Sequence, residues 1–185
     1  TLFIDSTGRL HIAGSGTSTL DNVQLNNAGT ISLAKGTFSS TLSLTNDTVI
    51  TNTNNGVIDI QNDFTQVIGS GSIDNFGLIK KSGGTGTSHI HAQIITETDS
   101  TIDGNSFQLA LYDVLLRGDS TFTDFPSFNG SISYEDGAKI FGNVWMNTDW
   151  GPTMTGNGSD TLFIDSTGRL HIAGSGTSTL DNVQL

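Results

Sequence analysis

The chain contains no cysteine. This absence excludes a disulfide framework, iron–sulfur ligation and cysteine-based zinc sites. Proline occurs only at Pro126 and Pro152, so the chain is neither a polyproline linker nor a collagen. A run of about 18 apolar residues is also missing, and the sequence therefore predicts no membrane-spanning segment.

Positive charge is scarce as well. Lys and Arg number 7 against 18 Asp and Glu, which gives a net charge of −11 at pH 7. Because the basic residues are spread along the chain, they form no stripe that could follow a phosphate backbone, and nucleic acid is not an expected partner. The acidity favours solubility and cation binding. Apolar residues make up 34% of the chain, but their short alternating groups argue against disorder.

The sequence does contain one long repeat. Residues Thr1–Leu25 and Thr161–Leu185 are identical at all 25 positions. We interpret residues 1–160 as one complete repeat unit and residues 161–185 as the start of the next identical unit; a duplication introduced by cloning is the alternative. Repeat proteins stack their units so that each buries its faces against its neighbours. The chain is therefore expected to be a piece of a longer tandem array.

Short alternating segments dominate the remaining pattern. Apolar residues recur at every second position in groups such as TISLA, VIDI and HIHAQI, and Gly, Asn, Asp and Ser lie between the groups. The best candidate helix, Phe107–Leu116, also alternates as a strand would. The pattern predicts an all-β protein. Several Asn-Gly and Asp-Gly pairs leave local hairpins open as an alternative to a solenoid.

A recurring phrase favours a right-handed parallel β-helix, or β-solenoid. Asn and Gly precede an alternating strand in Asn26–Leu33, Asn52–Ile60 and Asp74–Lys81, and the starts of these phrases are 26 and 22 residues apart. Their spacing suits one coil of three strands, and Asn and Thr stack well on like neighbours in successive coils. We expect about seven coils in the 160-residue unit, which would advance about 33 Å along the axis at about 4.8 Å per coil.

Aromatic residues concentrate between Ile95 and Gly151. Core packing is the expected role of most of them, because aromatic rings dominate burial. The alternative is an exposed platform for sugar or for a neighbouring filament. Trp150 is the best candidate for such a platform, since Gly151 and Pro152 follow it in an evident loop.

The phrases NNAGTISL (26–33) and DNFGLIKKSGGTGTSHI (74–90) carry a resemblance to known surface proteins. They resemble coils of filamentous-haemagglutinin-like β-solenoid adhesins and related tandem-repeat surface or filament proteins of bacteria and archaea. The likeness covers about residues 1–95 and 161–185. It implies an extracellular β-helical stalk used in adhesion, biofilm-matrix building or filament formation. The chain departs from these adhesins in its period, because they often repeat every coil whereas identity returns here only at Thr161.

One turn suggests a calcium site. Residues 155–163 read TGNGSDTLF and resemble the calcium-binding nonapeptide G-G-x-G-x-D-x-U-x in all but its first glycine. In that motif the glycines let the turn close, and backbone carbonyls and the Asp supply oxygen ligands. The matching residues are Gly156, Gly158 and Asp160, which makes Ca²⁺ the one candidate cofactor. Because a β-roll needs several copies in tandem, a plain turn between coils is the competing interpretation.

Two histidines and three asparagines are further candidates. His89 and His91 would share one face of a strand, where two imidazoles could meet one metal ion. No third ligand stands at a usable spacing, so we expect neutral histidines that face solvent. Asn46, Asn129 and Asn157 begin N-x-S/T triplets and are glycosylation candidates where the source glycosylates its exported proteins. Chance is the alternative explanation in a chain rich in these residues.

Together these features predict a structural protein and not an enzyme. No G-x-S-x-G, H-E-x-x-H, Walker or Rossmann phrase occurs, and scattered carboxylates do not by themselves make a hydrolytic site. We expect a stiff rod at the cell surface or outside the cell, whose copies stack head to tail into an open filament and whose further partners are surface glycans. A carbohydrate-binding module and a β-helical polysaccharide-cleaving enzyme are the alternatives.

Overall fold

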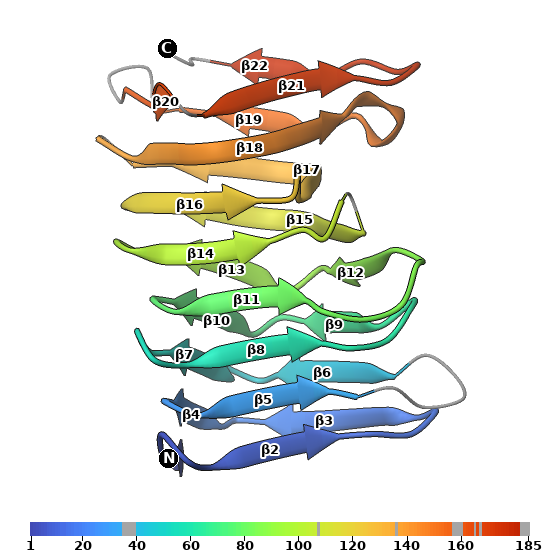
Figure 1. The fold of residues 1–185 in the computed structure, drawn as a ribbon, viewed down its shortest axis with the longest axis vertical. Coiled ribbons are helices and arrows are strands. Elements are labelled where there is room, and N and C mark those ends of the chain that lie inside the picture. Colours follow the sequence, from blue (N-terminus) through green and yellow to red (C-terminus); the bar gives the residue numbers. More distant parts are fainter. Residues whose placement is uncertain are drawn as a thin grey trace.

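A computed structural model describes residues 1–34, 40–106, 108–135, 137–156, 161–164, 166 and 168–181. The chain winds into a β-solenoid, in which the strands of successive coils stack on one another, as the sequence predicts (Figure 1). Strands on the near side of Figure 1 run from left to right, and the chain returns behind them as it climbs towards its C-terminal end, so the coil is right-handed. Every strand pairing within the described ranges is parallel, so no hairpin forms among them.

Each coil presents three faces, and three long strands bend from one face to the next. The bending strands are β15 (Leu109–Leu116), β17 (Ser127–Tyr134) and β18 (Lys139–Asn147), the last followed by the 3₁₀ turn η1 (Thr148–Trp150). The first face consists of β1 (Leu2–Ile4), β4 (Gln24–Asn27), β7 (Val49–Asn52), β10 (Ser72–Asn75), β13 (Gln93–Thr96), the second halves of β15 and β17, β19 (Thr153–Thr155) and β22 (Thr179–Asp181).

The other two faces are built in the same way. The second face consists of β2 (Arg9–Ile12), β5 (Thr30–Leu33), β8 (Val57–Ile60), β11 (Leu78–Lys81), β14 (Ser100–Asp103), β16 (Asp119–Thr123), the first half of β18 and β20 (Phe163–Ile164). The third face consists of β3 (Thr17–Asp21), β6 (Thr41–Thr45), β9 (Gln66–Gly69), β12 (Ser88–Ile90), the first halves of β15 and β17, the second half of β18 and β21 (Arg169–Ala173).

The core is a set of apolar columns that run along the axis. Alternate residues of each strand point inward, so parallel pairing in register places an apolar side chain above the one in the coil below. On the first face this column is Leu25, Ile50, Ile73, Ile94, Val114, Ile132 and Met154, each at most 1% exposed. Burial of such columns is the dominant stabilising contribution to the fold. The aromatic region contributes Phe122 and Phe128, which are fully buried and meet edge to face at 5.7 Å.

A buried ladder of asparagines explains the recurring Asn-Gly phrase. Asn27, Asn52 and Asn75 are aligned by strand register and are 0% exposed. Asn27 Nδ2 donates to Asn52 Oδ1 at 2.8 Å, and Asn52 Nδ2 donates to Asn75 Oδ1 at 2.7 Å. The backbone turns closely around these amides, and a Cβ on Gly56 would overlap Asn52 Oδ1. The predicted stacking of Asn between coils is therefore confirmed, and the corner requires glycine.

Replacement of the central ladder residue should destabilise the whole rod. Asn52→Ala removes the acceptor of Asn27 and the donor to Asn75, and leaves buried polar groups unpaired on both sides. We expect a loss of about 2–4 kcal/mol in the free energy of unfolding, measured by urea denaturation. The matched control is Asn54→Ala, at an exposed turn position of the same coil, which should change stability by less than about 0.5 kcal/mol. Equal effects of the two variants would contradict a structural role of the ladder.

A buried lysine closes the corner after β11. The Lys81 side chain is 0% exposed, and its Nζ lies 3.4 Å from Asp63 Oδ1 and donates to the carbonyls of Asn62 and Gly83. Asp63 Oδ1 also accepts from the backbone N of Gly86 at 2.7 Å. That backbone hydrogen bond, assisted by Lys81, lowers the pKa of Asp63, whereas burial lowers the pKa of Lys81.

The lowered pKa of Asp63 predicts an acid-dependent loss of stability. A carboxyl group whose pKa falls on folding stabilises the protein above its unfolded pKa, near 3.8, and this contribution disappears as the pH falls through the folded value. Asp63→Asn should therefore be less stable than the wild type at pH 7, and the difference should be smaller at about pH 3, below the unfolded pKa. Urea unfolding at the two pH values measures it; a difference that is the same at both would show that the charge of Asp63 contributes nothing.

The two copies of the 25-residue repeat lie on different faces of the coil. In the first copy, β1, β2 and β3 occupy the first, second and third faces; in the second, β20, β21 and β22 occupy the second, third and first. From β1 to β19 the chain completes seven coils on the first face, and β20 begins one face later. The 160-residue sequence period is therefore not a period of the fold. The cause is variable coil length, because the step from Val114 to its partner Ile132 is much shorter than the step from Met154 to its partner Leu180.

Candidate functional site

A groove runs along the outside of the third face, which we call the axial groove. Strand register aligns His89, Ala110, Ser127, Trp145 and His171 in one outward column over five successive coils. Two small side chains, Ala110 and Ser127, thus lie between an imidazole on one side and an indole on the other. Since neighbouring coils are about 4.8 Å apart, the pair of small residues leaves a hollow about two coils long.

The 3₁₀ turn after β18 forms one wall of the axial groove. Asn147 caps the turn, because its Oδ1 accepts from the backbone N of Asp149 at 3.1 Å. Gly151 ends the turn at φ +62°, in the left-handed region that favours glycine. Trp150 is held there with its ring edge-on to Tyr112 at 6.4 Å and is 61% exposed. The structure confirms that Trp150 is exposed, as the loop that follows it predicts.

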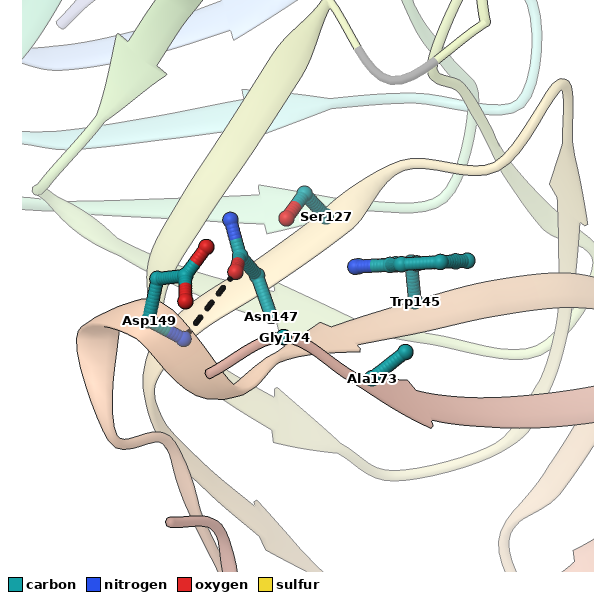
Figure 2. Close-up of a pocket in the computed structure, with 6 residues that line it drawn as sticks. All are labelled: Ser127, Trp145, Asn147, Asp149, Ala173 and Gly174. Carbon is teal, nitrogen blue, oxygen red and sulfur yellow. Dashed lines mark hydrogen bonds between the residues drawn. The ribbon is translucent and has the colours of Figure 1, made fainter. Parts of the chain in front are cut away.

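The axial groove consists of two adjoining hollows that share Ser127 and Asn147. The first has a volume of about 320 Å³ and is lined by Ser127, Trp145, Asn147, Asp149, Ala173 and Gly174 (Figure 2). The second has a volume of about 260 Å³ and is lined by Thr87, His89, Ala110, Ser127, Asn129, Asn147 and Trp150. These volumes are close to the lower end of the range for small-molecule sites.

Two amide side chains offer hydrogen-bond donors to the axial groove. Ser127 Oγ donates to Asn129 Oδ1 at 2.5 Å, so the oxygen end of Asn129 is occupied. The oxygen end of Asn147 is occupied by the Asp149 amide, and Figure 2 shows its Nδ2 end turned the other way. Within the described residues, neither Nδ2 donates to a protein acceptor. Asn129 is 6% exposed and is among the residues that line the second hollow.

The axial groove carries little charge. Burial, with a smaller contribution from the His91 charge, lowers the pKa of His89, so this imidazole is neutral at pH 7. Hydrogen bonds from Ser175, through its hydroxyl and its backbone N, lower the pKa of Asp149 and keep its carboxylate ionised. Asp149 is the one acidic residue among the described residues that line the two hollows. Its negative charge lies at one end of the groove, beside Gly174.

His89 and His91 pack together with one tyrosine, Tyr112, in a cluster of three rings. Tyr112 stacks on His91 with ring centroids 4.1 Å apart, and its hydroxyl lies 3.1 Å from His89 Nδ1. His91 is exposed, as expected, but His89 is half-buried. No group of three or more His, Cys, Asp or Glu that could hold a metal ion is found in the part of the chain that the structure describes.

Of the remaining candidate residues that the structure describes, Asn129 lies in the axial groove, and Asn46 and Gly156 lie elsewhere on the solenoid. Gly156 follows β19, but Gly158, Asp160 and Asn157 lie outside the described residues, so calcium binding stays a prediction. Asn46 is exposed in the turn after β6, where its Nδ2 donates to Asp21 Oδ1 at 2.7 Å. Asn129 is buried in the axial groove. Among the described candidates, Asn46 is therefore the more accessible for glycosylation.

The sequence singles out Trp150, His89 and Asn129 separately, but no local sequence pattern indicates that they line one groove. Ala110, Ser127 and Trp145 are far apart along the chain, and they become neighbours only through the register of successive coils. The available signal was the alternation in HIHAQI and LALYDVLL. It would have allowed the two segments to be aligned as stacked strands.

The strands and the axial groove together define a parallel β-solenoid with a laterally open groove. Comparison with protein-family models, curated proteins and solved structures finds no match to this chain. The described residues contain no helix that is long and apolar enough to cross a membrane.

Proposed function

We propose that this chain is a segment of a stiff extracellular rod, built from tandem 160-residue units, that supports attachment of cells to one another or to surfaces. Its role is mechanical and not catalytic. Parallel strands hydrogen-bond along the axis, so the coils of one unit can continue those of the next without a joint.

The difference in burial between the two copies of the repeat is the main observation that supports this proposal. Leu2 is 48% exposed, but its equivalent Leu162 is 0% exposed; Ile12 is 8% exposed, but its equivalent Ile172 is 47% exposed. The first copy is covered only from the side of β4 to β6, and the second only from the side of β18 and β19. A copy inside an array would be covered from both sides. The repeat therefore has two complementary end surfaces along the axis, and each already packs well against its own neighbouring coils.

The length of the array tests the rod. In small-angle X-ray scattering, chains of one, two and three units should lengthen by about 35 Å per unit at constant cross-section, given about 4.8 Å per coil. Units that fold as separate globules on flexible connections would instead give a variable spacing and would contradict the rod.

The extracellular setting rests on the resemblance of residues 26–33 and 74–90 to coils of surface adhesins. Antibodies raised against this chain should label intact, unpermeabilised cells of the source. Labelling that requires permeabilised cells would contradict a surface location, but it would not contradict the rod-like architecture.

A further inference from the structure

We propose that the axial groove binds a neutral oligosaccharide that lies along the solenoid axis. This binding activity goes beyond the mechanical role of the rod, because it needs only side chains of coils that the 185-residue chain already contains, from His89 to Gly174. Shape, hydrogen-bonding chemistry and charge each support it.

The shape of the axial groove suits a linear ligand of more than one ring. Its two hollows share Ser127 and Asn147 and continue one another from His89 to Gly174. The hollow over Ala110 and Ser127 is about two coils long, or about 10 Å at the spacing of stacked strands, which is the scale of a disaccharide. The groove opens to solvent along the side of the rod, so a longer chain could extend past both ends.

The chemistry of the axial groove matches the two surfaces of a pyranose ring. A pyranose has an apolar face of C–H groups and a rim of hydroxyl groups. Trp150 offers a large apolar surface that is 61% exposed yet held in place against Tyr112, an arrangement suited to the apolar face of a ring. The Nδ2 groups of Asn129 and Asn147 are donors whose partner oxygens are already used within the protein. Hydroxyl oxygens of the ligand can accept from both, which would satisfy the nearly buried Asn129.

The charge of the axial groove disfavours anionic ligands. Asp149 is ionised, His89 is neutral, and the chain as a whole carries a net charge of −11. Uronates, sulfated glycans and nucleic acids would be repelled over most of their approach. Neutral saccharides escape this repulsion and need no counter-charge from the protein.

The two tryptophans of the chain both line the axial groove and make binding directly observable. Each indole N–H gives a separate signal in a ¹H–¹⁵N spectrum of the 185-residue chain. We would titrate it with cellotetraose, mannotetraose, xylotetraose and chitotetraose, and with tetragalacturonate as the anionic comparison. At least one neutral tetrasaccharide should shift both indole signals and saturate, and tetragalacturonate should shift neither.

Variants distinguish binding at the axial groove from nonspecific binding elsewhere on the rod. Trp150→Ala should weaken binding by about tenfold or more. Asn129→Asp keeps the oxygen that accepts from Ser127 but removes the Nδ2 donor, and it should weaken binding to a similar extent. Phe64→Ala removes an aromatic ring of similar exposure outside the groove and should leave affinity unchanged. Lack of a response to every neutral tetrasaccharide, a response to tetragalacturonate alone, or equal loss in Phe64→Ala and Trp150→Ala would overturn the proposal.

Discussion

In an array of several 160-residue units, cryo-electron microscopy should show each unit turned by about one third of a full turn relative to the one before. The expected rise is about 35 Å per unit, and the array should superimpose on itself without rotation only after three units and about 106 Å. The reason is the placement of the repeat: the first copy begins on the first face with β1, and the second copy begins on the second face with β20, after seven complete coils.

The rotation, and not the rise, decides this prediction. Seven whole coils would give a rise of about 34 Å, which is close to the expected value, but no rotation between units. A measured twist near zero would therefore show that the second copy occupies the same faces as the first in the array. A twist of about one third of a turn would confirm the offset seen between Arg9–Ile12 on the second face and Arg169–Ala173 on the third.

The rotation also determines how the rod presents its side surface. A feature that occurs once in each unit, such as the axial groove or the exposed Asn46 turn, would point in three directions around the rod. Such an array would contact partners on all sides, which suits multivalent attachment. Polymers in which all axial grooves line one side would contradict this arrangement.

Ile172→Lys should abolish end-to-end association of separate chains. Ile172 pairs with Met146 in an inward-pointing column, but it is 47% exposed because no described coil covers it. Uncovered strand edges and apolar columns template further pairing. The wild-type chain should therefore form longer particles as its concentration rises, as seen by analytical ultracentrifugation. A charged ammonium group at the centre of the contact would have to be desolvated, which costs several kcal/mol.

The matched control for this variant is Phe64→Lys. Phe64 is 63% exposed, at a corner on the side of the rod. The same change of charge there should leave association unaltered, because the side surface takes no part in stacking coils. Wild-type chains that stay monomeric at high concentration would contradict head-to-tail stacking. If Phe64→Lys suppressed association as strongly as Ile172→Lys, net charge and not the end surface would be responsible.

Much of the coil could be predicted because its local signals are repetitive. Asn26–Leu33, Asn52–Ile60 and Asp74–Lys81 each place an amide before a tight turn and an alternating strand, and the spacing between them is the length of one coil. These positions became the buried ladder. Between Phe107 and Leu116 the sequence left helix and strand open, and pairing with coils on either side fixed a strand over Leu109–Leu116.

By itself, the sequence determined that the protein is all-β, that its strands are short and alternate, and that the segment Thr1–Leu25 recurs as Thr161–Leu185. Tertiary structure alone decided which face each copy of that segment occupies and which side chains meet across coils. Ala110 and Ser127 form the floor of the axial groove, and Trp145 lies next to them, through hydrogen-bonded register. The physical reason why the sequence alone did not determine these contacts is that the number of residues per coil varies along the rod. Turns of different size join strands that are equally spaced along the axis. Alternation is a local property that can be read directly from the sequence. The register between two strands, in contrast, depends on the length of every turn that precedes them in the chain.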